Sequence, residues 1–174
     1  HDQVEAMTMG TRIVVMKDGF VQQIAAPHVL YDTPANLFVA TFMGSPVMNT
    51  FEAKLVDENN TTYVVFDNNK VALPDSKGRK PEVMSYIGKE VIVGIRPEAL
   101  HDEEVFINQF PDAIIEAKVD VVEMMGAETY LYLSCEDLDF IARVSPRSHT
   151  KVGDILKIAL ETPKIHLFDK ETEL

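Results

Sequence analysis

Cysteine is almost absent from this 174-residue chain, in which Cys135 is the single example. One thiol forms no internal disulfide and supplies no thiolate cluster for structural zinc, so the composition fits a reducing, cytoplasmic setting. The histidines His28, His101, His149 and His166 are scattered without the spacing of metal ligands. We therefore expect no metal site.

Basic residues are also scarce, because 16 Lys and Arg face 28 Asp and Glu and give a formal net charge of -12. A single-strand nucleic-acid binder needs a positive groove lined with stacking aromatic side chains. An acidic surface instead repels phosphate and keeps a protein soluble. The charge balance therefore excludes nucleic acid from the expected partners.

Long hydrophobic runs are missing as well. The longest apolar stretches, such as the one over Ile13 to Met16, are far shorter than the roughly 20 residues that a membrane-spanning helix needs. Hydrophobic residues nevertheless make up 46% of the chain and charged residues 25%, with a mean hydropathy of -0.03. This balance is typical of a globular protein with a folded core.

Residues 1–46 have a mixed α and β pattern. Asp2 and Glu5 have the D-x-x-E spacing of a helix capping box, which predicts a helix that runs to about Met9 and stops at Gly10. The other features predicted here are strands over 11–16 and 20–25 joined by a turn at Lys17-Asp18-Gly19, helices over 28–31 and 35–43, and a boundary at Gly44-Ser45-Pro46.

The rest of the chain, residues 47–174, is a succession of short segments rich in Val, Ile, Tyr and Phe. So many short strands in a small domain favour a barrel or a sandwich. Polar and apolar residues largely alternate in Lys118-Val119-Asp120-Val121, as in a strand with one wet face. The strands are predicted over 51–56, 62–66, 70–73, 91–96, 114–123, 129–134, 140–144, 155–159 and 165–168, with core residues Val93, Ile95, Val119, Val121, Leu131, Leu133, Ile158 and Leu160.

A series of motifs runs in order along the chain. The first is the segment from His1 to Thr8. The further motifs are Arg12-Ile13-Val14-Val15-Met16-Lys17-Asp18-Gly19, Gln22-Gln23-Ile24, Pro27, Leu30-Tyr31, Pro34-Ala35-Asn36, Phe38-Val39-Ala40, Gly44-Ser45-Pro46-Val47-Met48-Asn49, Val93-Gly94-Ile95-Arg96-Pro97-Glu98, the run from Val121 to Tyr130, and Lys164-Ile165-His166-Leu167-Phe168-Asp169. Together these motifs resemble the ATPase subunits of bacterial sugar-importing ABC transporters, and the segment from His1 to Thr8 is similar to the switch-histidine segment of that family.

The resemblance implies a mainly β chain with two parts. Residues 1–46 would be the C-terminal remnant of the nucleotide-binding domain, and residues 47–174 the transport-associated OB (TOBE) barrel that regulates and assembles the parent ATPase. In the parent, His1 would hydrogen-bond the γ-phosphate of ATP. The implied setting is cytoplasmic, peripheral on the inner face of the membrane, with the permease subunits, a cytoplasmic regulator and a second copy of the chain as partners.

Five residues are the candidates for regulatory or interdomain contacts: Arg96, Glu98, Glu123, Gly126 and Glu128. Arg96 and Glu98 straddle Pro97, whose fixed backbone would hold them apart at a defined distance. They would either pair with each other at a barrel edge or meet another domain or a regulator. Gly126 is predicted to be a turn residue with positive φ.

The neighbouring Met124 and Met125 are expected to pack in the core, with an adaptable contact surface as the alternative.

A phosphate-binding loop of the form G-x-x-x-x-G-K-[ST] is also absent from the sequence. We therefore expect a fragment that neither binds ATP nor hydrolyses it, ATP and magnesium being cofactors of the parent protein alone. Its hairpin would then lack part of its packing, which predicts a homodimer through residues 1–46. Two alternatives remain open: an importer of another solute, such as glycerol phosphate, a polyamine or an oxyanion, and a free-standing small-molecule-binding OB module.

Overall fold

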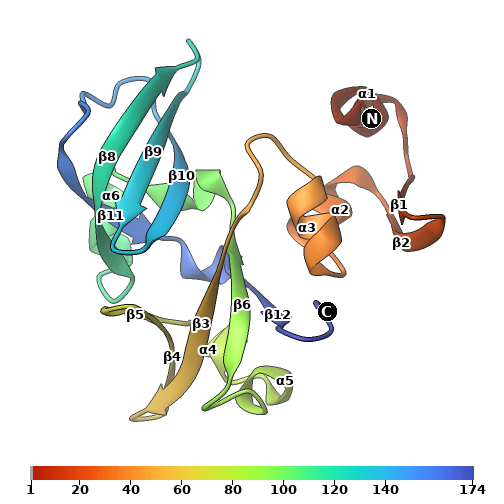
Figure 1. The fold of residues 1–174 in the computed structure, drawn as a ribbon, viewed down its shortest axis with the longest axis horizontal. Coiled ribbons are helices and arrows are strands. Elements are labelled where there is room, and N and C mark those ends of the chain that lie inside the picture. The colour runs from red at the N-terminus through yellow and green to blue at the C-terminus, as the bar shows by residue number, and fades with distance from the viewer. Residues whose placement is uncertain (1) are drawn as a thin grey trace. The chain divides into compact units, whose positions relative to one another are not determined.

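The computed structural model, drawn in Figure 1, describes residues 2–174, so the switch-histidine prediction for His1 lies outside the described residues. Contacts divide the chain into two compact units. The N-terminal unit comprises the described residues up to Met48 together with Phe168–Leu174, and the barrel comprises Asn49–Leu167. The domain boundary between residues 46 and 47 stays a prediction.

The N-terminal unit begins as its sequence predicts. Helix α1 (Gln3–Met9) is capped by Asp2, whose carboxylate accepts a hydrogen bond from the Glu5 amide at 2.9 Å. At Gly10 a Cβ atom would lie 2.9 Å from the Ala6 carbonyl oxygen, so the chain needs a glycine where the helix ends. The predicted hairpin follows as β1 (Ile13–Lys17) and β2 (Phe20–Ala25).

The turn of this hairpin has positive φ at both central residues, 51° at Asp18 and 83° at Gly19. Helices α2 (Pro27–Asp32) and α3 (Leu37–Phe42) come next, as predicted, and the Asn36 side chain caps α3. The small core of this unit consists of Val15, Leu30, Val39 and Met43.

Two five-stranded sheets contain the remaining strands. Their orders are β12-β6-β3-β4-β5 and β10-β9-β8-β11-β7. All nine strands predicted beyond residue 47 are present, and short elements without a readable periodicity were missed. The strands are β3 (Asn49–Glu58), β4 (Thr61–Phe66), β5 (Asn69–Ala72), β6 (Glu90–Ile95), β7 (Leu100–His101), β8 (Ile114–Met124), β9 (Thr129–Cys135), β10 (Leu138–Val144), β11 (Ile155–Leu160) and β12 (His166–Asp169); the helices are α4 (Asp75–Gly78), α5 (Pro81–Met84), α6 (Glu104–Gln109) and the 3-10 turns η1 (Pro97–Ala99) and η2 (Thr162–Lys164).

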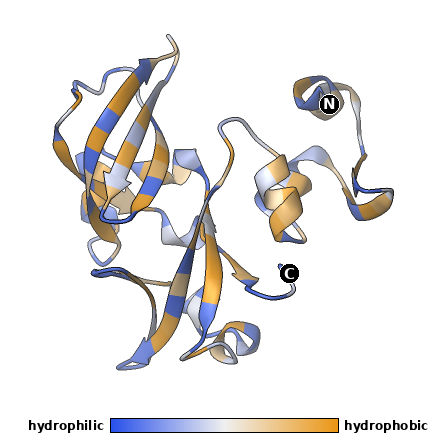
Figure 2. Cartoon of the chain, viewed as in Figure 1, coloured by the Kyte–Doolittle hydropathy of each residue, from blue (hydrophilic) through white to orange (hydrophobic). Residues whose placement is uncertain are grey.

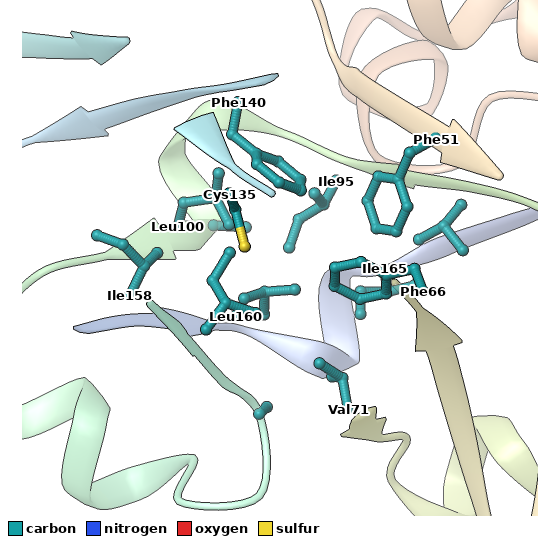
Figure 3. Packing of buried hydrophobic residues seen from close by; sticks show 14 of the residues in the cluster. Phe51, Phe66, Val71, Ile95, Leu100, Cys135, Phe140, Ile158, Leu160 and Ile165 are labelled. Carbon is teal, nitrogen blue, oxygen red and sulfur yellow. The ribbon is translucent and has the colours of Figure 1, made fainter. Parts of the chain in front are cut away.

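The barrel encloses one core to which both sheets contribute. Apolar and polar residues alternate along its strands, as the banding in Figure 2 shows. Figure 3 shows the centre of this core, where the Phe51 ring lies 4.6 Å from that of Phe66 and 5.4 Å from that of Phe140. Seven of the predicted core residues are buried: Val93, Ile95, Val119, Leu131, Leu133, Ile158 and Leu160.

The eighth predicted core residue, Val121, is wrong, because its side chain is 50% exposed. The pairing of β8 with β9 shifts between Val119 and Val121, which is a β-bulge around Asp120. The extra residue reverses the alternation that the sequence pattern assumed. Val122 therefore points inward against the core, and Val121 points outward opposite Tyr132.

The first residue of β3 joins the two sheets. Asn49 is 8% exposed, and its side-chain amide accepts from the Ile141 N–H at 2.7 Å and donates to the Ile141 carbonyl at 2.9 Å. The same NH₂ group donates to the Ile95 carbonyl at 3.2 Å. The Asn49 side chain thus makes the same two hydrogen bonds to β10 that a neighbouring strand would make, and it hydrogen-bonds backbone groups of both sheets.

A second joint links the turns at the far ends of two hairpins. The Glu136 carboxylate accepts from the backbone N–H of Asn68 at 2.9 Å and from its side-chain amide at 2.6 Å. These hydrogen bonds lower the pKa of Glu136. The β4–β5 turn is thereby fastened to the β9–β10 turn.

Lys77 makes a third joint. Its ammonium group, on α4, donates to the carbonyls of Pro163 and Ile165 beside η2. Burial, with the nearby charge of Lys80, lowers the pKa of Lys77 to about 8. The neutral amine of Lys77 is therefore more favoured in the folded state than in the unfolded chain. The two carbonyl acceptors, which favour the ammonium form, partly offset this preference.

We expect Asn49→Ala to lower the free energy of unfolding by about 2 kcal/mol, because it leaves the backbone groups of Ile141 without their partner. Urea unfolding followed by circular dichroism measures the change. Asn108→Ala, on the exposed face of α6, is the matched control and should stay within about 0.5 kcal/mol of the parent chain. A loss no larger than that of the control would contradict the role of Asn49.

The lowered pKa of Lys77 predicts a rise in stability with pH. Between the folded value of about 8 and the ordinary value of 10.5, the unfolded chain binds more protons, so raising the pH through this window favours the fold. Relative to Lys77→Met, the parent chain should gain about 1 kcal/mol from pH 8 to pH 10, roughly half of the full linkage value because the side chain is partly exposed. Lys80→Met should shrink the gain, and a flat difference in urea titrations would refute the prediction.

Candidate regulatory site

An ion-pair cluster centres on Arg143 of β10. Its guanidinium group lies 3.3 Å from the Glu128 carboxylate and 3.7 Å from the Glu98 carboxylate. All three side chains are about one-quarter to one-third exposed, so solvent screens the pairs only in part. Arg143 thus joins the loop before β9 to η1, two segments that are far apart in sequence.

Two tyrosines of β9 hold the neighbouring carboxylates in place. Tyr130 donates its hydroxyl to Glu128 at 2.8 Å, and Tyr132 donates to Glu123 at 2.9 Å. Each hydrogen bond raises the pKa of its tyrosine, because the carboxylate stabilises the protonated phenol. One oxygen of Glu128 thereby meets Tyr130 and the other meets Arg143.

Gly126 lies in the turn between β8 and β9 with a φ of 87°, which confirms the predicted positive φ. A Cβ atom there would meet no neighbour within 4 Å, so the backbone angle and not space selects glycine. The preceding methionines are not core residues: Met124 is 80% exposed and Met125 52% exposed. The prediction of core packing is wrong because β8 extends past the barrel before it turns.

Arg96 is 5% exposed and directly precedes η1. The Glu98 carboxylate, two residues further on, faces Arg143. The structure therefore gathers Glu98, Glu123 and Glu128 around the outer ends of β8 to β10. It places Arg96 inside the barrel wall and Gly126 in the adjoining turn.

Sequence reasoning missed the residues that connect these carboxylates, namely Arg143, Tyr130 and Tyr132. Strand alternation does place all three on wet faces. Their meeting depends on the register, which sets Arg143 opposite Tyr130 and Tyr130 opposite Glu123. A single sequence contains no signal for that register.

A separate hollow of about 570 Å³ lies beside the loop after β10. Its polar groups are largely satisfied among themselves, since the Ser148 hydroxyl donates to Asp102 at 2.6 Å and lies 2.8 Å from that of Thr150. Within residues 2–174, no three His, Cys, Asp or Glu side chains are grouped so that they could hold a metal ion. The Arg143 cluster is therefore the better-defined candidate, because its ion pairs and hydrogen bonds bring distant segments together.

These features define a class: an OB-type β-barrel module with an ion-pair cluster on its surface. The cytoplasmic molybdate-binding protein ModG has a solved structure that matches with a TM-score of 0.52 and 15% identity, covering 68% of this chain and 94% of the ModG chain. At that identity the likeness shows the fold alone.

Two family models match consecutive parts of the chain: the MalK OB fold domain over residues 44–100 and the TOBE domain over residues 93–168. The oligosaccharides import ATP-binding protein MsmX of Bacillus subtilis is 44% identical over the whole chain, which covers 47% of MsmX. The osmoprotective compounds uptake ATP-binding protein GgtA of Synechocystis is 38% identical over 99% of the chain and 46% of GgtA. The chain therefore carries the MalK OB fold and TOBE domains and is homologous over its whole length to part of ABC-transporter ATP-binding proteins.

The chain spans about half the length of the curated relatives that it matches. No helix within the described part of the chain combines the length and the apolar character needed to cross a bilayer.

We expect Arg143→Met to lower the free energy of unfolding by about 1 kcal/mol, because two partly screened ion pairs are lost and two carboxylates are left facing each other. In that background Glu98→Gln should be neutral or stabilising, whereas by itself it should be destabilising. Double-mutant cycles by urea unfolding measure both couplings, and 0.5 M salt should weaken them. Equal effects of Glu98→Gln in the two backgrounds would show that the pair is not coupled.

Proposed function

We propose that residues 47–174 are the regulatory and assembly domain of the ATP-hydrolysing subunit of an ABC importer, and that residues 1–46 are the end of its nucleotide-binding domain. The observation that supports this is the succession of the MalK OB fold and TOBE models over residues 44–168. Relatives named as ATP-binding proteins match the chain from end to end. The chain would then be the part of the subunit that follows its catalytic loops.

The proposed solute is a sugar. MsmX, at 44% identity, is named for oligosaccharide import, which favours this choice. GgtA, at 38%, is named for osmoprotective compounds and represents the alternative of another solute. In either case the barrel would serve the same regulatory role, because the MalK OB fold and TOBE models match it whichever solute is imported.

The parent protein would use ATP and magnesium, and His1 would be its switch histidine. It would sit in the cytoplasm against the inner face of the membrane, with permease subunits and a second ATP-binding subunit as partners. The chain by itself would not be an enzyme, since its sequence lacks the phosphate-binding loop.

The exposed apolar side chains of the β1–β2 hairpin indicate that another surface packs against it. Val14, Met16, Phe20, Val21 and Ile24 are between 48% and 75% exposed, although a β1–β2 hairpin by itself is marginal in water. We propose that these side chains are covered in the parent by the rest of the nucleotide-binding domain, and in the isolated chain by a second copy.

The test is to delete residues 49–167 from the full ATP-binding protein and to compare its ATP hydrolysis and its mass by light scattering with those of the intact subunit. We expect hydrolysis within about twofold of the intact subunit and a weakened dimer, because a regulatory domain adds contacts and not catalytic groups. The 174-residue chain by itself should show no ATP turnover. Turnover by that chain which survives repurification, or an unweakened dimer after the deletion, would contradict the proposal.

A further inference from the structure

The outer face of β8, β9 and β10 carries a cross-strand row of apolar and aromatic side chains. Val121, Tyr132 and Ile141 lie opposite one another in the register of the three strands, which Figure 1 shows side by side. Val121 is 50% exposed, and Tyr132 and Ile141 are half-buried. This face turns away from the core and leaves apolar surface in water.

The bulge around Asp120 creates this row. Without it, strict alternation would send Val121 into the core with Val119 and would leave Val122 outside. The bulge instead brings Val121 opposite Tyr132 and adds an acidic residue beside them. Bulges commonly re-aim side chains next to functional sites, so a bulge that exposes a valine calls for a reason outside the core.

The aromatic part of the face is rigid. The hydroxyls of Tyr130 and Tyr132 are tied to Glu128 and Glu123, so neither ring is free to change rotamer without losing a hydrogen bond. A tyrosine held in this way offers a large contact area at a low cost in conformational entropy when a partner binds.

A hollow of about 430 Å³ adjoins the row and is lined by Tyr132, Ile141, Asp120 and Asp139 among others. The carboxylates of Asp120 and Asp139 are exposed, and within the described residues neither takes part in a hydrogen bond or an ion pair. The hollow therefore combines an aromatic wall with two carboxylates that are not paired with another group of the described residues.

This combination suits the side chain of an arginine or a lysine. Its aliphatic stem would pack against Ile141, its cation would face the Tyr132 ring, and the two carboxylates would accept its hydrogen bonds. The net charge of -12 adds attraction at longer range for a basic partner. A second copy of the chain would bring the same acidic face and would be repelled.

We propose that the outer face of β8, β9 and β10 is the docking surface for a protein partner that presents a basic side chain beside an apolar one. The basic side chain enters the hollow lined by Tyr132, Asp120 and Asp139, and the apolar one packs on Val121. The inference deepens the proposed regulatory function and rests on it, because it gives the chemistry that a regulator of this domain would need.

The probe is a short fluorescein-labelled peptide that alternates arginine and leucine, titrated into the 174-residue chain. We expect saturable binding by anisotropy, with amide resonance shifts concentrated on β8, β9 and β10. Asp120→Asn with Asp139→Asn should weaken binding about fivefold, and Val121→Lys at least as much. Both changes are on exposed positions, and thermal unfolding confirms that the variants fold.

Asp75→Asn with Glu82→Gln removes the same charge from α4 and α5 and is the matched control, expected within about twofold of the parent chain. Equal losses from the two double variants would reduce the binding to general charge attraction and overturn the proposal. Shifts away from β8, β9 and β10 would also overturn it, as would shifts on that face that depend on chain concentration without peptide, which would identify a second copy as the occupant.

The peptide titration measures binding to this face whether or not the domain regulates an ATPase. Deletion of residues 49–167 from the full subunit tests the proposed function and does not depend on this face. A failure of one can therefore be told from a failure of the other.

Discussion

The barrel depends on how the edge of β10 is closed, and the Asn49 side chain does this with a single amide group. An unpaired strand edge beside a core would leave backbone N–H and C=O groups without partners, which costs more than an ordinary hydrogen bond contributes. Asn49 satisfies both groups of Ile141 and also reaches Ile95, so the two sheets are fastened where β3 begins. The shared core of Phe51, Phe66 and Phe140 can then be enclosed from both sides.

The same barrel departs from regular pairing between Val119 and Val121, and the docking surface that we propose lies there. The bulge in β8 is followed by an exposed valine, the two tyrosine–carboxylate pairs and the ion pairs of Arg143. A regular strand would have placed Val121 in the core and left Val122 outside, so the bulge exchanges which of the two valines packs inward. The core that both sheets form keeps a valine at this point, so the fold tolerates the irregular pairing.

The charge of that surface decides which kind of partner it attracts. The chain has a large acidic excess, and Arg143 of β10 is already engaged by two carboxylates. The attraction that remains is toward positive groups, and the Tyr132 ring beside Asp120 and Asp139 adds an apolar wall to these charges. A surface of this kind agrees with the regulatory role that we propose.

The sequence by itself determined the local elements. The capping residue Asp2, the turn at Asp18 and Gly19, the nine long strands and the positive φ of Gly126 all follow from short-range rules of backbone geometry. The family resemblance also lay in contiguous motifs. Only the tertiary structure decided that Val121 faces water, that Met124 and Met125 leave the core, and that Arg143 joins Glu98 to Glu128. The first depends on one inserted residue, the second on how far β8 extends past the barrel, and the third on which segments the fold brings beside Arg143. All three are set by contacts between segments far apart in the chain and not by the residues next to them.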